Sequence, residues 1–171
     1  MAFDAFLKLT TTTGQQVQGE SQDKVHLNEI ELNGYNLGAV HPTNVGSATG
    51  GAGAGKATFN DFSFTTPSVS KVTPILFQAC AQGTRYSSAI VYVSKAGGSG
   101  PGTGVDYLTI TMGTVFVSSF TTGGPSGDAA PHDEIRLAYG SLKIQYIPQG
   151  PNGTAQAPVS GGWDVVKNAP A

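Results

Sequence analysis

Charged side chains are scarce in this sequence of 171 residues. Asp, Glu, Lys and Arg together make up 12% of the chain, which is about half the share found in ordinary soluble proteins. A monomer normally covers its surface with charge, so the scarcity indicates that a partner covers part of this surface. The net charge of −2 provides no basic patch for nucleic acid or for an anionic membrane.

Cysteines and long apolar runs are equally rare. The single cysteine, Cys80, excludes an internal disulfide framework. No segment approaches the roughly 20 apolar residues that a transmembrane helix needs, so we expect no membrane insertion. The N-terminus, MAFDAFLKLTTTT, lacks the charged and apolar regions of a signal peptide. We therefore expect a soluble protein made in the cytoplasm which, if exported, leaves without a cleaved leader.

Strand patterns separated by Gly-rich and Pro-rich loops dominate the chain. Its length suits a single domain, residues 1–171. One helix is expected at about Pro74 to Gln82, with Thr73 as N-cap and Gly83 as C-cap. The sequence therefore predicts a mainly β protein, an antiparallel barrel or sandwich with one helix packed on it. The expected strands are 3–9, 26–40, 56–66, 88–94, 105–121, 135–147 and 162–167.

Two of these strands carry features that leave alternatives open. Asn33-Gly34 could form a tight turn, but a bulge in one long strand is favoured because little that could pair follows it. The strand at 88–94 is apolar on both faces between Ile90 and Val93, whereas an antiparallel sheet usually has one wet face. Exposed strand edges also tend to pair with a neighbour. A closed ring of identical subunits satisfies both demands.

An extended loop at about 38–55 precedes Lys56. Its end, Gly50, four residues, Gly55 and Lys56, resembles a phosphate-binding loop. Such a loop needs a strand before it, a helix after it, and Ser or Thr after the lysine. Here Ala57 follows the lysine, and the next segment has strand character. The pattern therefore favours a surface loop with a binding role over a nucleotide site.

The titratable residues do not form a recognisable reactive site. The histidines and the cysteine are not at close metal-ligand spacing, and the acidic group is expected to be solvated loop charge. The cysteine lies on the apolar stripe of the expected helix, which predicts a structural thiol. There is no Gly-x-Ser-x-Gly elbow. We predict no enzyme activity and no catalytic, cofactor or metal site. The residues considered are His26, His41, His132, Cys80, Asp128, Asp133 and Glu134.

Several short motifs, in this order and at this spacing, are typical of one family. They are Met1 to Lys8; Gly19-Glu20-Ser21 with Asp23 and His26; Glu29-Ile30; Gly55-Lys56 with Asp61 to Phe64; Thr73-Pro74 with Ala79-Cys80 and Gly83; Lys95 to Gly98; Tyr107 to Thr111; Val117 to Ser119 with Thr122 to Gly124; and Gly162-Trp163. Each motif alone is unspecific, but together they cover nearly the whole chain. In them the chain resembles haemolysin-coregulated protein (Hcp), the tube subunit of the bacterial type VI secretion system.

The resemblance implies a β-barrel-like fold of two sheets flanked by a helix. It also implies a homohexamer whose rings stack into a tube, a sheath around the tube, a spike at its tip, and small effector proteins carried in the lumen. A protein of this kind has no cofactor and is a virulence factor exported from the bacterial cytoplasm. A phage-like tail tube subunit or a monomeric β-sandwich binding module is the alternative function.

Two groups of residues are expected to make contacts in such an assembly. The extended loop is predicted to reach an adjacent subunit or the next ring. Asn36 is predicted to face the lumen while Tyr35 and Leu37 pack inside. The predicted interface residues are His41, Pro42, Val45, Ala52, Ala54 and Lys56.

Overall fold

A computed structural model describes residues 3–42, 56–95, 105–125, 127, 130–150 and 154–171. The mainly β architecture with one helix that the sequence predicts is confirmed. The elements in chain order are β1 (Phe3–Thr11), β2 (Ile30–Leu32), β3 (Gly34–Asn36), β4 (Ala39–Val40), β5 (Thr58–Phe59), β6 (Phe62–Thr65), α1 (Val72–Gln82), β7 (Arg85–Lys95), β8 (Val105–Gly123), β9 (His132–Tyr146), β10 (Val159–Asp164) and β11 (Ala169–Pro170).

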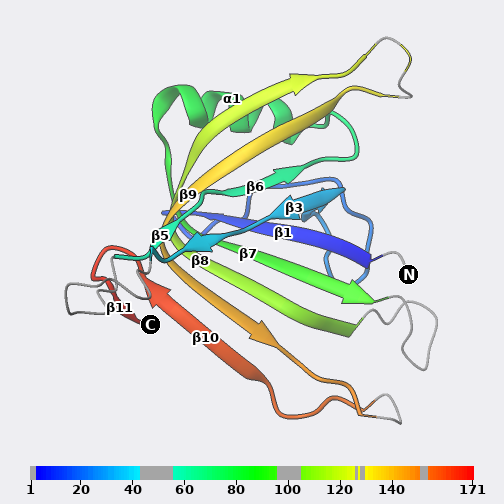
Figure 1. Cartoon of the computed structure of the whole chain (residues 1–171). Coiled ribbons are helices and arrows are strands. Elements are labelled where there is room, and N and C mark those ends of the chain that lie inside the picture. The colour runs from blue at the N-terminus through cyan, green and yellow to red at the C-terminus, as the bar shows by residue number, and fades with distance from the viewer. Residues whose placement is uncertain (1–2, 43–55, 96–104, 126, 128–129, 151–153) are drawn as a thin grey trace.

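Antiparallel pairing winds the long strands into a barrel (Figure 1). β2 pairs with β1, and the pairs β1–β7, β7–β8, β8–β9, β9–β6 and β6–β3 continue the path. Only Asn33 separates β3 from β2, and the N–H of Asn33 donates to the carbonyl of Thr65 at 2.8 Å. The single bulged strand expected here is therefore wrong. The chain stays extended but changes partner at Asn33, and this change closes the barrel.

A second interruption divides the strand expected at 56–66. β5 pairs with β4 in a separate two-stranded sheet, whereas β6 pairs with β3 and β9 in the main sheet. The break falls at Asn60 and Asp61. The expectation of two sheets is thereby confirmed, although the second sheet is only the small hairpin β4–β5.

Strand β9 has different partners along its length. Its first half, Glu134 to Leu137, pairs with β6, and its second half, Ser141 to Tyr146, pairs with β10. β10 and β11 therefore extend the sheet past the barrel, at the end away from α1 (Figure 1). The last strand was expected at 162–167, but β10 already begins at Val159, because Val159 and Ser160 pair with β9.

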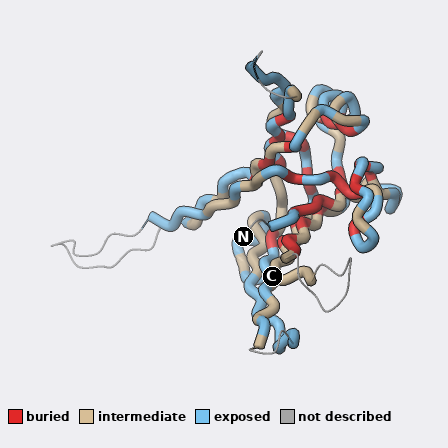
Figure 2. Tube along the Cα trace, turned by 90° about the vertical axis from the view of Figure 1, so that its right-hand side faces the viewer, coloured by how far each residue is buried: buried red, intermediate tan, exposed pale blue. Residues whose placement is uncertain are grey.

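The core lies inside the barrel, and its strand residues come mainly from alternating positions of β1, β2, β6, β7, β8 and β9. Phe62 and Phe64, two residues apart on β6, are both buried, as are Val91 and Val93 on β7. Figure 2 shows the buried stretches gathered in the middle of the molecule, while the ends of the long hairpins are exposed. Burial of the alternating face, rather than any single contact, holds the strands in register.

Helix α1 begins at Val72, with Lys71 rather than Thr73 as its N-cap. The N–H of Lys71 donates to the Glu20 carboxylate at 3.1 Å, so a distant loop satisfies this helix end. Thr73 lies inside the first turn, and its hydroxyl donates to Asp133. Gly83 ends the helix in the left-handed conformation with φ 64°, as predicted. In the described ranges we find no helix with the length and hydrophobicity needed to span a membrane.

Asp133 corrects the expectation of solvated loop charge. It lies in β9 and is fully buried, while His132 and Glu134 on either side are exposed. Its N–H donates to the hydroxyl of Thr66 at 3.1 Å, and its carbonyl accepts the N–H of Thr66 at 3.0 Å. Asp133 therefore joins β9 to the segment that leads into α1. Asp128, expected in the same loop, lies outside the described residues.

Candidate interaction surface

The hairpin β4–β5 forms the base of the long loop. Ala39 pairs with Phe59, and the N–H of Asn60 donates to the carbonyl of Gly38 at 2.9 Å. The hydroxyl of Tyr139 on β9 donates to the carbonyl of Asn60, also at 2.9 Å. Burial, and secondarily the charge of Asp61, raises the pKa of Tyr139 to about 12, so this hydroxyl keeps its proton at neutral pH.

Opposite the hairpin lies the apolar face of the sheet extension. Leu142 on β9 pairs with Trp163 on β10, and Ile144 follows two residues after Leu142 on the same face. The pairing of β6 with β9 ends at Leu137, so the barrel does not cover this face. The exposed fraction rises from 8% at Leu142 to 39% at Ile144 and 44% at Tyr146.

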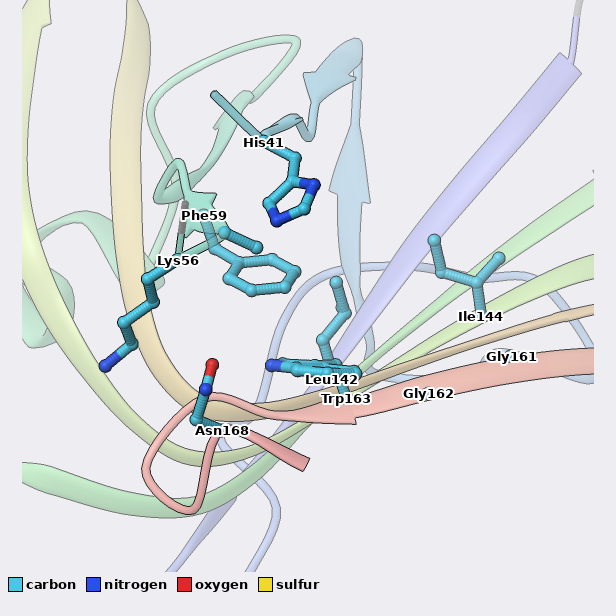
Figure 3. Close-up of a pocket in the computed structure, with 10 residues that line it drawn as sticks. His41, Lys56, Phe59, Leu142, Ile144, Gly161, Gly162, Trp163 and Asn168 are labelled. Carbon is cyan, nitrogen blue, oxygen red and sulfur yellow. The ribbon is translucent and has the colours of Figure 1, made fainter. Parts of the chain in front are cut away.

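The hairpin and this face enclose a groove with a volume of about 640 Å³. In Figure 3, His41 and Phe59 on the hairpin side face Leu142 and Trp163 on the sheet side. The groove is mainly apolar, with Lys56 and Asn168 at its margin. The residues lining it are His41, Lys56, Ala57, Phe59, Leu142, Ile144, Gly161, Gly162, Trp163 and Asn168.

Two residues of β10 fix the floor of the groove. A Cβ at Gly162 would lie 2.9 Å from the carbonyl oxygen of Ala171, so a glycine lets the chain end pack against β10. The N–H of Ala171 donates to the carbonyl of Gly162 at 3.2 Å. The indole Nε1 of Trp163 is buried and has no hydrogen-bond partner among the described residues. The floor is thus a mainly apolar surface, against which the chain end packs closely.

Two of the predicted interface residues, His41 and Lys56, line this groove. Pro42 is exposed at the end of the described hairpin arm. Val45, Ala52 and Ala54 lie outside the described residues, so their role stays a prediction.

Asn36 is exposed on β3, while Tyr35 and Leu37 pack against the core as expected. Asn36 lies beside a polar hollow of about 430 Å³, which Asn60, Asp61, Ser63 and Arg136 also line. Its orientation toward a lumen stays a prediction, because that depends on how subunits are arranged.

The sequence alone did not indicate that Trp163, Leu142 and Ile144 form part of a binding surface. Leu142, Ile144 and Tyr146 alternate along β9 and therefore lie on one face of the strand. Strand patterning gives no sign that β6 covers only the first half of this face. That information lies in the register of β6 on β9, which is long-range.

The described residues give little support to a phosphate-binding loop, a reactive cysteine or a metal site. Lys56 is followed by strand β5, not by the helix that a phosphate-binding loop needs. Cys80 is half-buried and packs against the core, as expected for a structural thiol. Among the described residues, no group of three or more His, Cys, Asp or Glu side chains could hold a metal ion.

Comparison with known proteins connects this geometry to one family. The family described as "Type VI secretion system effector, Hcp" matches residues 6–146. The chain is also 36% identical, over the full length of both chains, to "Protein hcp1" of Pseudomonas aeruginosa. The chain belongs to the Hcp family. It is therefore a structural tube subunit of the type VI secretion system. Proteins of this family form ring and tube assemblies.

Solved structures agree with this assignment. One described as "Structure of a type six secretion system protein" superposes with a TM-score of 0.88 at 27% identity, covering 99% of this chain and 100% of that chain. Hcp1 from Salmonella typhimurium gives a TM-score of 0.76, also at 27% identity, with complete coverage of both chains. Family membership favours a secretion tube subunit over the phage-tail alternative. Hcp is a family of structural, secreted proteins, and the expected lack of catalysis remains a prediction for this chain.

Proposed function

We propose that six copies of this Hcp chain form a ring, that the rings stack into a hollow tube, and that small effector proteins travel in its lumen. The tube would act with a sheath and a spike, and the chain would leave the bacterium without a cleaved signal peptide. The observation that carries the proposal is the groove between hairpin β4–β5 and the β9–β10 face. An apolar surface that the subunit itself leaves uncovered favours occupation by a neighbouring copy.

The groove is proposed to receive a different surface of the neighbouring copy. It lies at the end of the sheet away from α1 (Figure 1). A contact between two different surfaces of the same chain is head-to-tail, and it produces a ring when the rotation closes. The long loop that starts and ends at this groove is proposed to reach the adjacent subunit or the next ring.

Ile144→Lys tests the ring, because Ile144 is 39% exposed and lines the groove. The substitution would bury a charge at the subunit contact while leaving the isolated fold unstrained. Ile75→Lys on α1 is the matched control, since Ile75 has a similar exposure of 42%. Light scattering after size-exclusion chromatography should give hexamers for the unaltered chain and for I75K, and smaller species for I144K. A monomeric unaltered chain at high concentration would overturn the ring proposal.

The proposed lumen position of Asn36 has its own experiment. In a Cys80→Ala background, Asn36→Cys is labelled with a maleimide gold cluster, and rings are imaged face-on by electron microscopy. We expect the gold near the ring centre. A label at Gln78→Cys, which is exposed on α1, serves as a reference at a different radius. Gold from Asn36→Cys at the ring periphery would contradict the lumen assignment while leaving the ring intact.

A further inference from the structure

His26 is buried between two carboxylates from different parts of the chain. Its Nδ1 lies 2.9 Å from Oε2 of Glu29, and its Nε2 lies 3.1 Å from Oδ1 of Asp106 on β8. His26 is 4% exposed and Glu29 is 6% exposed. Both ring nitrogens therefore face carboxylate oxygens at hydrogen-bonding distance, in a place that bulk water hardly reaches.

These two hydrogen bonds need more protons than a neutral imidazole carries. Neutral histidine has one N–H and one lone pair, and an ionised carboxylate can only accept. If His26 were neutral and both carboxylates ionised, a lone pair would face a carboxylate oxygen, and a buried hydrogen bond would be lost. The geometry therefore requires one additional proton, held on the ring or on one of the two carboxylates.

Neighbouring side chains hold the imidazole in this position. The ring of Phe6 on β1 stacks on it at a centroid distance of 4.6 Å, and Tyr92 on β7 lies 4.9 Å away on a tilted plane. The hydroxyl of Ser94, also on β7, donates to the same Asp106 oxygen that faces Nε2. Three strands of the barrel thus position His26 and one of its acceptors.

Burial and the charges around the cluster raise some pKa values and lower others. Burial raises the pKa of Glu29, which favours its protonated form, while His26 and Lys8 favour the ionised form. Burial, with the charges of Glu29 and Asp106, also raises the pKa of Tyr92 and keeps that ring neutral. Asp23 has its pKa lowered, because its carboxylate accepts backbone N–H bonds from the turn.

The cluster anchors an exposed turn. His26 lies in the turn at residues 24–28, between Val25 and Leu27, whose side chains are 59% and 55% exposed. Asn28 adopts a left-handed conformation with φ 58°, and its N–H donates to the carbonyl of Ser21 at 2.9 Å. The imidazole is the side chain of this turn that reaches across to β8.

We propose that His26, Glu29 and Asp106 form a proton-dependent clamp, which fixes the turn at residues 24–28 on the barrel and releases it as the pH rises. The clamped state binds one more proton than the released state. The clamp therefore stabilises the turn at lower pH. This stabilisation is lost as the pH rises through the range in which the clamped state gives up that proton. The two exposed apolar side chains of the turn are presented in one fixed position only while the clamp is protonated.

Amide hydrogen exchange of the full chain measures this linkage. Exchange at Val25, His26 and Asn28 is followed from pH 7 to pH 10 and corrected for the base-catalysed intrinsic rate. Loss of one proton predicts that opening increases by about tenfold per pH unit over the range where the proton is lost. Glu29→Gln supplies a permanent N–H donor to Nδ1, so its corrected exchange should be independent of pH. His132→Gln, at an exposed histidine, should behave like the unaltered chain.

Nuclear magnetic resonance of the unaltered chain locates the proton directly. At pH 7, either both ring nitrogens of His26 should show protonated ¹⁵N shifts, or the carboxyl of Glu29 or of Asp106 should show a protonated ¹³C shift. Equal exchange slopes in the unaltered chain and E29Q would overturn the proposal. A neutral His26 between two ionised carboxylates at pH 7 would overturn it as well, and this measurement does not depend on any variant folding.

Discussion

The hydroxyl of Tyr139 on β9 donates a 2.9 Å hydrogen bond to the backbone carbonyl of Asn60, the residue that closes hairpin β4–β5. This bond ties the base of the long loop to the barrel, close to the groove. It joins residues that are far apart in the sequence, and it is one of the contacts that hold the hairpin in place beside β9.

Tyr139→Phe removes this bond without changing the shape of the ring. We expect a loss of about 1 kcal/mol in the free energy of unfolding, because one partly exposed hydrogen bond is lost. Urea unfolding at fixed protein concentration measures it. Tyr146→Phe is the control, since no hydrogen bond of Tyr146 with another described side chain is found and its side chain is 44% exposed. Equal losses in the two variants would contradict the tethering role.

Alkaline titration tests the same tyrosine. Its pKa of about 12 lies above the ordinary value of 10, because burial disfavours the phenolate. A raised folded pKa means that the neutral phenol stabilises the fold below pH 10, and that this contribution is lost as the pH rises toward 12. Difference absorbance near 295 nm should show the same ionisation up to pH 11 in the unaltered chain and in Y139F. If Y139F lacked part of the absorbance change below pH 10.5, Tyr139 would ionise in that range, and this would contradict its raised pKa.

Thr73 and Asp133 provide a test of a buried polar contact. Thr73→Val keeps the shape of the side chain but leaves the buried Asp133 carboxylate without its hydroxyl donor. We expect a loss of about 1–3 kcal/mol in the free energy of unfolding. Thr121→Val, at an exposed position of β8, is the matched control and should leave the free energy of unfolding nearly unchanged. Thermal unfolding gives the comparison, and an unchanged transition in T73V would refute the contact.

Gly19 is confined by the loop that carries the His26 cluster. A Cβ at Gly19 would lie 2.1 Å from the carbonyl oxygen of Glu29, a contact that no side-chain movement relieves. Gly19→Ala should therefore destabilise the fold by about 1–3 kcal/mol through forced backbone displacement. Gly123→Ala, where a Cβ meets open space outside the groove, is the control. Chemical denaturation compares them, and similar midpoints would show that the loop yields easily.

The long loop can be shortened without touching the barrel. Deletion of residues 48–53, which lie outside the described residues, should leave the unfolding transition nearly unchanged, because the closing bonds at Asn60 remain. We expect weaker ring formation or stacking, seen as fewer rings and shorter tubes in negative-stain images. A deletion of Gly153 in a different loop serves as control. Normal ring and tube yield after the 48–53 deletion would remove the loop from the interface.

The sequence determined where most of the strand-forming segments lie, although two of the expected strands are divided in the structure. Phe62 and Phe64 alternate with polar residues in the sequence, and both are buried in the structure. When one face of a strand is buried, its apolar residues can only lie on that face. Gly83 marked the helix end because a left-handed cap suits glycine. The family motifs along the chain likewise identified the family without any coordinates.

The tertiary structure decided where strands change partner. The switch at Asn33 depends on Thr65, and the uncovered face of β9 depends on β6 leaving after Leu137. Asp133 looked like loop charge because its partners, Thr66 and Thr73, are some 60 residues away. Periodicity reports only local geometry, whereas pairing, closure and buried polar contacts arise between distant segments. For this reason the groove and the His26 cluster became visible only once the barrel had brought their residues together.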